Sequence, residues 1–316
     1  TPAAPPALPP APPPFQPTPV APAPLPIPAA PAPSQPFFGN TPFPPALRSP
    51  FISSLAWDGR RLWVGTANDG LWVFQDGQWS GLNSRNGGLA DDQIVALWNL
   101  QGRTHLYSWV MGLMDLDSGR AVGVLAKDRL RDLLAVAADR SSVLFLFQGG
   151  FVRRLTPQND LEAVSRIPED FFKTARQLHL VDGQPVVVAD QGLLARDSTG
   201  RWLVTFFPTE GRDGRAVASA MSPDGRLFVA LSTGEIFAAT GKTITRLGRI
   251  EQKPRSLVFA DTLWVAGTTQ LYRLAGNGLT PVGPALRETV IGFQPLPERQ
   301  AVLLATTAGL QALALP

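Results

Sequence analysis

Residues 61–79 read RLWVGTANDGLWVFQDGQW, and this stretch contains the pattern that decides the fold. Its segments 61–66 and 70–74 are rich in β-branched and aromatic residues, which are typical of strands. Ala67-Asn68-Asp69 separates them, and Asp76-Gly77 follows, a dipeptide that suits the positive φ of two-residue hairpins. The stretch therefore predicts short antiparallel strands joined by tight turns.

The same unit recurs along the chain. We use the residue that opens the third strand of each unit as a marker. The seven markers are Gly70, Gly112, Gly150, Gly192, Gly234, Gln270 and Gly309. Their successive spacings are 42, 38, 42, 42, 36 and 39 residues. A repeat of about 40 residues is typical of propeller blades, whereas a β-helix repeats at a shorter period. We therefore predict an all-β fold, a seven-bladed β-propeller with four-stranded blades.

The last unit has room for only three strands, over about 288–294, 301–306 and 309–315. An unpaired blade edge would expose a template for strand pairing. We therefore expect residues just before the first blade, about Phe43 to Ile52, to supply the fourth strand of the last blade. This assigns residues 46–316 to the propeller and residues 1–45 to an arm or linker.

The arm is rich in proline: 21 of the 32 prolines lie in the first 50 residues, and no charged residue precedes Arg48. Proline lacks an amide donor, so this segment favours extended polyproline II over helices or central strands. A spacer is one interpretation. The other is an adhesive arm, because usual linkers carry Ser, Thr, Gly or charge in place of apolar residues. The candidate partner-binding anchors are Phe15, Val20, Leu25, Ile27, Phe37 and Phe38.

Residues 61–79, followed by NSRNGGLADDQIVAL at 83–97, resemble the two-component-regulator propeller repeat of exported bacterial sensor domains. The resemblance is clearest over 52–97 and recurs in diluted form at Leu263-Trp264-Val265-Ala266-Gly267. It implies a β-propeller. Blades of this kind serve sensors, scaffolds and enzymes alike, so the resemblance identifies fold more strongly than function.

Charge and composition restrict the partners and the location. The net charge is +3 without a run of Lys or Arg, so we expect no nucleic-acid partner. No stretch of about 18 apolar residues predicts a membrane span. The first residues of the sequence are small residues and prolines, which often follow a cleaved export signal. A sequence trimmed at its N-terminus would also begin with a residue other than Met, such as Thr1. We expect an exported protein that is periplasmic, at the cell surface or extracellular.

Residues that carry chemistry are sparse. The chain has no cysteine, no Gly-x-Ser-x-Gly sequence, and only two histidines, His105 and His179, which lie 74 residues apart. Enzymatic propellers of the lactonase type place carboxylates and Asn at the central channel. The expected inner strands are 53–57, 93–98, 131–137, 175–180, 215–221, 255–260 and 289–294, and Asp132 is their single acidic residue. We predict no catalytic residues, no metal site and no cofactor.

Eight tryptophans remain to be explained. We expect six of them to lie on strands and to fill the space between blades: Trp57, Trp63, Trp72, Trp98, Trp109 and Trp264. Trp79 and Trp202 begin outer strands, so they are the ones a binding patch would use.

These features together predict a non-catalytic protein-binding or scaffold subunit of a cell-envelope or extracellular assembly, tethered by its proline-rich arm. An alternative is a propeller that senses a ligand or carbohydrate. A metal-dependent hydrolase with its site in the channel is a third possibility. An exposed apolar face favours the first, and aromatic residues clustered around the channel mouth favour the second.

Overall fold

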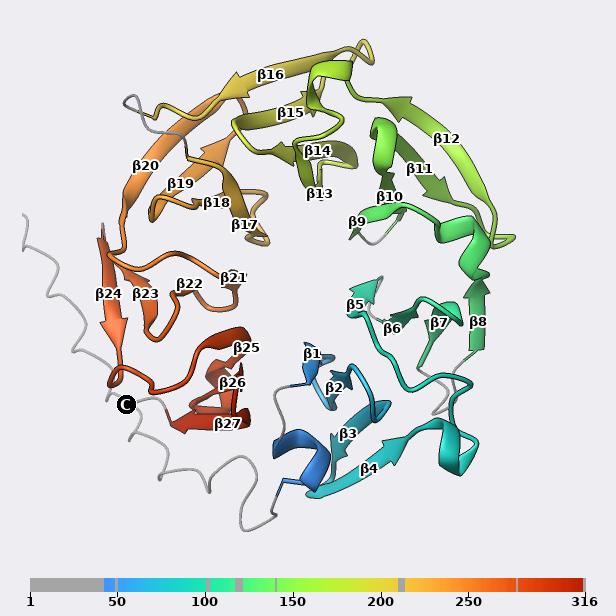
Figure 1. Cartoon of the computed structure of the whole chain (residues 1–316). Helices are drawn as coiled ribbons and strands as arrows, with labels where there is room; N and C mark the ends of the chain where they lie inside the picture. Colours follow the sequence, from blue (N-terminus) through green and yellow to red (C-terminus); the bar gives the residue numbers. More distant parts are fainter. Residues whose placement is uncertain are drawn as a thin grey trace, which may run out of the picture. The chain divides into compact units, whose positions relative to one another are not determined.

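The computed structural model shows seven antiparallel sheets arranged as the blades of a ring (Figure 1). It describes residues 43–48, 51–100, 103–116, 122–139, 141–209, 214–276 and 278–314. The predicted seven-bladed β-propeller is thus confirmed.

Each blade is an up-and-down sheet whose strands follow the chain order from the centre of the ring outwards. Blades 1 and 2 contain β1 (Ile52–Trp57), β2 (Leu62–Thr66), β3 (Leu71–Gln75), β4 (Gln78–Leu82), β5 (Ala96–Leu100), β6 (Arg103–Ser108), β7 (Gly112–Asp115) and β8 (Val122–Leu125). Blades 3 and 4 contain β9 (Leu133–Ala138), β10 (Val143–Phe147), β11 (Phe151–Leu155), β12 (Leu161–Arg166), β13 (Ala175–Val181), β14 (Gln184–Ala189), β15 (Gly192–Arg196) and β16 (Trp202–Phe206). Blades 5 and 6 contain β17 (Ala216–Met221), β18 (Leu227–Leu231), β19 (Glu235–Thr240), β20 (Thr243–Arg249), β21 (Ser256–Phe259), β22 (Leu263–Ala266), β23 (Leu271–Ala275) and β24 (Gly278–Val282). Blade 7 contains β25 (Val290–Leu296), β26 (Ala301–Thr306) and β27 (Gly309–Ala314).

Short 3-10 turns lie between some of these strands. Within the described residues they are η1 (Pro45–Arg48), η2 (Ser84–Asn86), η3 (Lys127–Leu130), η4 (Gln148–Gly150), η5 (Glu169–Phe171) and η6 (Pro297–Arg299).

Every sequence marker lies within one residue of the start of a third strand. The reason is a close approach of two backbones. A Cβ placed on Gly70 or Gly234 would collide with the carbonyl oxygen at the end of that blade's fourth strand, and both residues also have positive φ. Glycine therefore recurs about every 40 residues in six of the seven blades, because an added side chain would meet neighbouring atoms there; in blade 6 the marker is Gln270.

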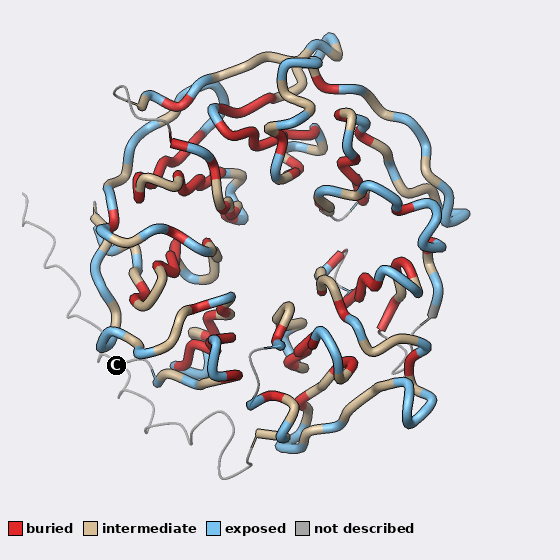
Figure 2. The backbone as a smooth tube through the Cα atoms, in the orientation of Figure 1, coloured by how far each residue is buried: buried red, intermediate tan, exposed pale blue. Residues whose placement is uncertain are grey.

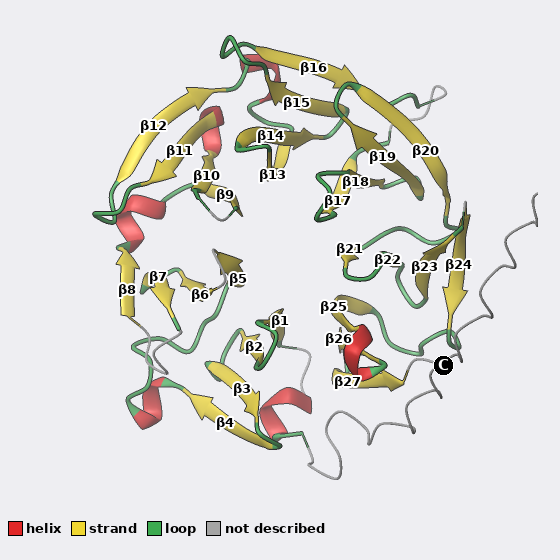
Figure 3. Cartoon of the chain, turned by 180° about the vertical axis from the view of Figure 1, so that it is seen from behind, coloured by secondary structure: helices red, strands yellow, loops and turns green. Residues whose placement is uncertain are grey.

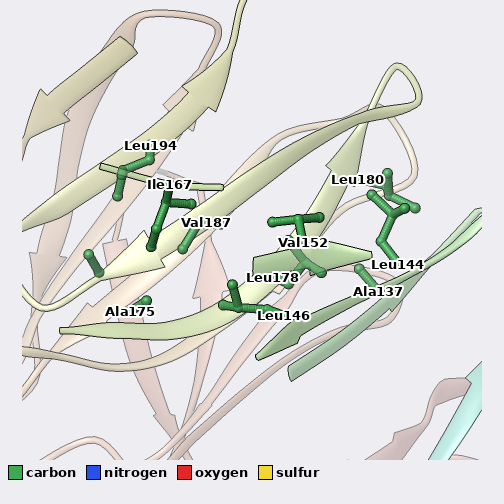
Figure 4. Close-up of a cluster of buried hydrophobic side chains, with 11 residues drawn as sticks. Ala137, Leu144, Leu146, Val152, Ile167, Ala175, Leu178, Leu180, Val187 and Leu194 are labelled. Atoms are coloured by element: carbon green, nitrogen blue, oxygen red, sulfur yellow. The ribbon is translucent and has the colours of Figure 1, made fainter. Parts of the chain in front are cut away.

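The core consists of seven apolar clusters, each between two neighbouring blades. In the cluster between blades 3 and 4, Leu144 and Leu146 of β10 pack with Leu178 of β13 and Val187 of β14 (Figure 4). Burial is concentrated in the middle strands, while the outermost strands are half-buried or exposed (Figure 2). Stability of the ring therefore depends on packing between the faces of adjacent blades.

Blade 7 differs from the expectation. We predicted that residues 43–52 would add a fourth strand to it, but its sheet has three strands, and Pro45–Arg48 forms the 3-10 turn η1. This turn packs against β27, and Leu47 is fully buried with Leu303 and Leu310 of blade 7. Residue 52 begins the inner strand of blade 1. The segment before blade 1 therefore covers the edge of blade 7 without extending its ladder.

The ring has two unlike faces. One carries the turns between first and second strands and between third and fourth strands; we call it the hairpin face. The other carries the turns between second and third strands and the connections from each blade to the next; we call it the crossover face. The turns η1 to η5 lie on the crossover face, which is turned toward the viewer in Figure 1, whereas η6 lies on the hairpin face, nearer the viewer in Figure 3.

Candidate functional site

Exposed apolar side chains gather on the crossover face. The large hydrophobic residues that are exposed among the described residues are Phe51, Trp109, Val110, Leu134, Phe151, Phe206 and Ile291. All seven lie in a connection between blades, in a turn between second and third strands, or within two residues of such a segment. This bias to one side of the ring makes the crossover face the candidate interaction surface, because apolar side chains scattered without a role would occur on both faces.

The hairpin face is built from short polar turns. Asp76-Gly77 and Asp182-Gly183 have positive φ at both residues, as predicted for two-residue hairpins. Asp58 accepts hydrogen bonds from the backbone amides of Arg60 and Arg61 and from Nε1 of Trp63 at 3.0 Å. Partial burial alone raises the pKa of Asp58, but these hydrogen bonds outweigh it and the pKa is lowered. The carboxylates in these turns therefore hold the hairpins in shape.

Trp109 corrects one sequence prediction. We expected it on a strand between blades, but it lies just after β6 in a turn of the crossover face and is 54% exposed. Its ring stands edge-on to Tyr107 at 5.3 Å between centroids, and Tyr107 stacks on Trp98 at 5.8 Å. Packing against Tyr107 holds the indole in place while one side stays open to solvent, as in aromatic hot spots of interfaces.

Two tryptophans that we expected between blades follow the prediction. Trp63 and Trp264 are almost fully buried and pack between blades. Trp79 and Trp202 are partly buried and pack against the apolar clusters. The two residues that we named for a binding patch are therefore not among the exposed ones.

A second aromatic group lies on the crossover face of blades 3 and 4. The guanidinium of Arg166 lies 4.6 Å from the ring centre of Phe151 and 4.4 Å from that of Phe172, and its Nε donates to the carbonyl of Gly149. Next to this group, Phe171 lies 6.5 Å from Phe206, which is 61% exposed. These contacts hold the exposed rings in place, so the rings themselves would lose little conformational entropy on binding.

The two histidines have structural partners. His105 lies on β6, and its Nδ1 is 3.1 Å from the carbonyl oxygen of Arg103. His179 lies on the inner strand of blade 4, and its Nε2 is 2.5 Å from Oγ of Ser219 on the inner strand of blade 5. Burial lowers the pKa of His179 to about 4, so its imidazole is neutral near pH 7.

This arrangement differs from a nucleophilic Ser-His pair. The Ser219 hydroxyl donates its hydrogen to Oε1 of Gln177, so the contact with His179 requires Nε2–H of the imidazole as donor. A general base would need the opposite direction, with the serine donating to an unprotonated ring nitrogen. The three side chains form a polar link between two inner strands, which the sequence pattern did not predict.

No group of three His, Asp or Glu side chains in the described part of the chain is placed to hold a metal ion. Among the same residues, no helix is long and apolar enough to cross a membrane. The predicted arm anchors Phe15, Leu25, Ile27, Phe37 and Phe38 lie outside the described residues, and their role stays a prediction.

Comparison with known proteins shows the fold. No family model and no curated protein matches the chain. Among solved structures, a streptogramin B lyase has a TM-score of 0.68 and 12% identity, covering 86% of this chain and 95% of that one. An extracellular domain from B. thetaiotaomicron, described as part of a hybrid two-component system, has a TM-score of 0.64 and 14% identity, covering 85% and 39%. PorZ of Porphyromonas gingivalis, a surface component of the type-IX secretion system, has a TM-score of 0.60 and 16% identity, covering 86% and 38%. At these identities the likeness shows that the chain shares the β-propeller fold, which sensor, secretion and enzyme proteins all use.

Proposed function

We propose that this chain is a non-catalytic protein-binding subunit of an exported assembly and that it binds its partner through the crossover face. The observation that carries the proposal is the gathering of all seven exposed large hydrophobic residues of the described chain on that face. Aromatic residues such as Trp109 and Phe206 supply most of the binding energy in many protein interfaces. The polar hairpin face offers no comparable anchors in its described residues.

The position of the aromatic residues separates this function from ligand sensing in the channel. Trp109 follows a second strand, Phe151 begins a third strand, and Phe206 ends a fourth strand. These three are thus spread across the width of the blades, whereas Phe51, Leu134 and Ile291 lie at or just before the starts of innermost strands. A broad face of separated anchors fits a protein surface better than a small ligand, which needs a concave site.

Several similar structures support the proposed setting. They include extracellular domains of sensor systems and a surface component of a secretion system. We extend that setting to this chain as part of the proposal, with a location in the periplasm, at the cell surface or outside the cell. The proline-rich residues 1–45 would act as the tether, with Phe15, Leu25, Ile27, Phe37 and Phe38 as its anchors.

The test compares partners that co-purify with the tagged full-length chain from its native envelope after cross-linking. We expect the Trp109→Ser/Phe206→Ser variant to lose the partner, because both side chains are exposed and their loss leaves the fold intact. Lys242→Ser, in a turn of the hairpin face, is the matched control and should retain it. Equal recovery with the two variants would contradict a role of the crossover face. Equal recovery by a chain lacking residues 1–45 would contradict the tether.

A further inference from the structure

A cavity of about 560 Å³ opens beside Phe206, where blade 4 connects to blade 5. Its walls come from the connection before β13, from the start of that strand, from the turn after β14, and from the described residues 206–209 and 214–215 that flank the connection between β16 and β17. The lining residues are Lys173, Thr174, Arg176, Asp190, Gln191, Phe206, Phe207, Thr209, Gly214 and Arg215. The cavity therefore belongs to the crossover face and adjoins one of its exposed aromatic anchors.

Its lining has an excess of positive charge. Among the lining residues that the structure describes, Lys173, Arg176 and Arg215 are three cations against the one carboxylate of Asp190, a net charge of +2. Arg176 pairs with Asp190, while Lys173 and Arg215 form no ion pair within the described residues. Two exposed cations at a cavity mouth attract an anionic group and favour it over a neutral or cationic one.

Asp190 gives the third cation a fixed position. Its side chain is only 8% exposed and accepts two parallel hydrogen bonds from Arg176, from Nε at 2.8 Å and from Nη2 at 2.9 Å. A bidentate contact of this kind orients a guanidinium and uses two of its five N–H groups. The hydrogen bond to Asp190 raises the pKa of Arg176, so the guanidinium stays charged. The remaining N–H groups are available to a second carboxylate.

The aromatic side chain of Phe206 stands at the entrance of the cavity beside these cations, and we call it the aromatic lip. Phe206 is the most exposed large hydrophobic side chain among the described residues, and the ring of Phe171 lies 6.5 Å from it. Phe207 is buried and stacks on Phe237 at 5.8 Å, which anchors the connection beneath the lip. A ligand that fills the cavity with an anionic group would thus contact an apolar ring at the entrance.

We propose that this cavity binds an acidic segment of the partner protein in which carboxylate side chains adjoin an apolar residue. This inference rests on the proposed function and specifies which chemistry the partner presents. The carboxylates contact Lys173, Arg215 and the free edge of Arg176, and the apolar residue covers Phe206. A small inorganic anion would satisfy the cations but leave Phe206 uncovered, so the aromatic lip favours a peptide.

Fluorescence anisotropy with the full-length chain tests this directly. The probe is the labelled peptide Gly-Asp-Asp-Phe-Glu-Asp-Gly, and its control is Gly-Asn-Asn-Phe-Gln-Asn-Gly. We expect the acidic peptide to bind at least tenfold more tightly at low salt and to weaken as NaCl is raised, because exposed charges are screened. The Lys173→Glu/Arg215→Glu variant should weaken it at least tenfold, whereas Lys242→Glu on the hairpin face should leave it unchanged. Equal binding of the two peptides, or equal binding by the wild-type chain and the double variant, would overturn the inference.

Two further measurements separate the possible failures. Phe206→Ser should weaken binding of the acidic peptide at least threefold, and it should leave binding of the same peptide with Ala in place of Phe unchanged. If inorganic phosphate displaces the Phe and Ala peptides equally well, the cavity is a simple anion site and the inference is wrong. In the co-purification experiment, a partner lost by Trp109→Ser/Phe206→Ser but kept by Lys173→Glu/Arg215→Glu would refute the acidic segment and leave the proposed function intact. A partner kept by both variants would refute the proposed function itself.

Discussion

The carbonyl oxygen of Leu47 lies only 2.5 Å from the position that a Cβ on Gly309 would take. In blades 1, 2 and 5, the same place beside the marker glycine is taken by the carbonyl at the end of that blade's own fourth strand, from Leu82, Leu125 and Ile250 respectively. The turn η1 therefore supplies to blade 7 the backbone contact that a fourth strand supplies elsewhere. The beginning of the described chain and its end meet at this contact, which closes the ring.

The first prediction concerns that contact. Gly309→Ala should lower the free energy of unfolding by about 2–4 kcal/mol, because φ is +106° and the added Cβ would displace η1. Gly59→Ala is a matched control, since Gly59 also has positive φ but nothing within 4 Å of its Cβ position. Urea unfolding measures both variants. If Gly309→Ala costs no more than Gly59→Ala, the close approach of Leu47 does not contribute to closure.

The second prediction concerns the side chain of Leu47, which is fully buried between blades 7 and 1. Leu47→Ala should destabilise the propeller by about 2–5 kcal/mol through loss of apolar contacts and the cavity left behind. Leu134→Ala removes the same atoms from an exposed position on the crossover face and should cost well below 1 kcal/mol. Thermal unfolding should show a clearly lower Tm for the first variant alone. Similar Tm values would mean that η1 is not part of the folded ring.

The sequence predicted the seven repeats because a steric requirement for glycine recurs in six of them at a regular spacing. Where two backbones approach closely, only glycine fits, and this leaves a mark that can be read at fixed spacing. Closure of blade 7 left no such mark. It depends on the carbonyl and the side chain of Leu47 in the turn η1, which contact blade 7. Leu47 and Gly309 of β27 are more than 260 residues apart in the sequence, and no local pattern specifies a contact between residues so far apart.

The candidate site was missed for a related reason. Strand-forming residues were assigned to strands, so Trp109 was placed between blades, although it occupies the turn that precedes the marker Gly112. The corresponding turns hold Asn68-Asp69, Asp190-Gln191 and Ser232-Thr233, all polar. Counted back from the markers, these polar pairs align with Val110-Met111, whereas Trp109 aligns with Ala67, Ala189 and Leu231. An apolar pair in a turn that is polar in those repeats was the available signal. The sequence pattern did not indicate that Phe151 and Phe206 are exposed, because their exposure depends on the residue at which a strand begins or ends within its blade.

The third prediction concerns Gln270, which stands in the one unit whose marker is not glycine. Its Nε2 donates to the carbonyls of Val282 and Leu271 at 3.0 and 3.1 Å, and its side chain is buried. Gln270→Gly would restore the repeat pattern yet should destabilise the propeller by about 1–3 kcal/mol, because buried carbonyls lose their donor. Gln270→Glu, which keeps the shape and replaces the donor by an acceptor, should be at least as destabilising at pH 7. A stabilising effect of Gln270→Gly in urea unfolding would refute this role.

The fourth prediction concerns pH and the inner-strand link between His179 and Ser219. The pKa of His179 is about 4 in the folded chain against an ordinary value of 6.5, because burial disfavours the imidazolium. Between these values the unfolded chain binds a proton that the folded chain does not, so the free energy of unfolding should fall as the pH is lowered from 6.5 to 4, by about 3 kcal/mol at most. His179→Gln removes this group while the carboxylates that titrate in the same range remain, so the difference between the two unfolding curves isolates the histidine. Above pH 7 the difference should be constant, and below pH 6.5 it should shrink as the wild type loses its advantage. Parallel curves from pH 7.5 to 4.5 would show that His179 is not held neutral between the blades.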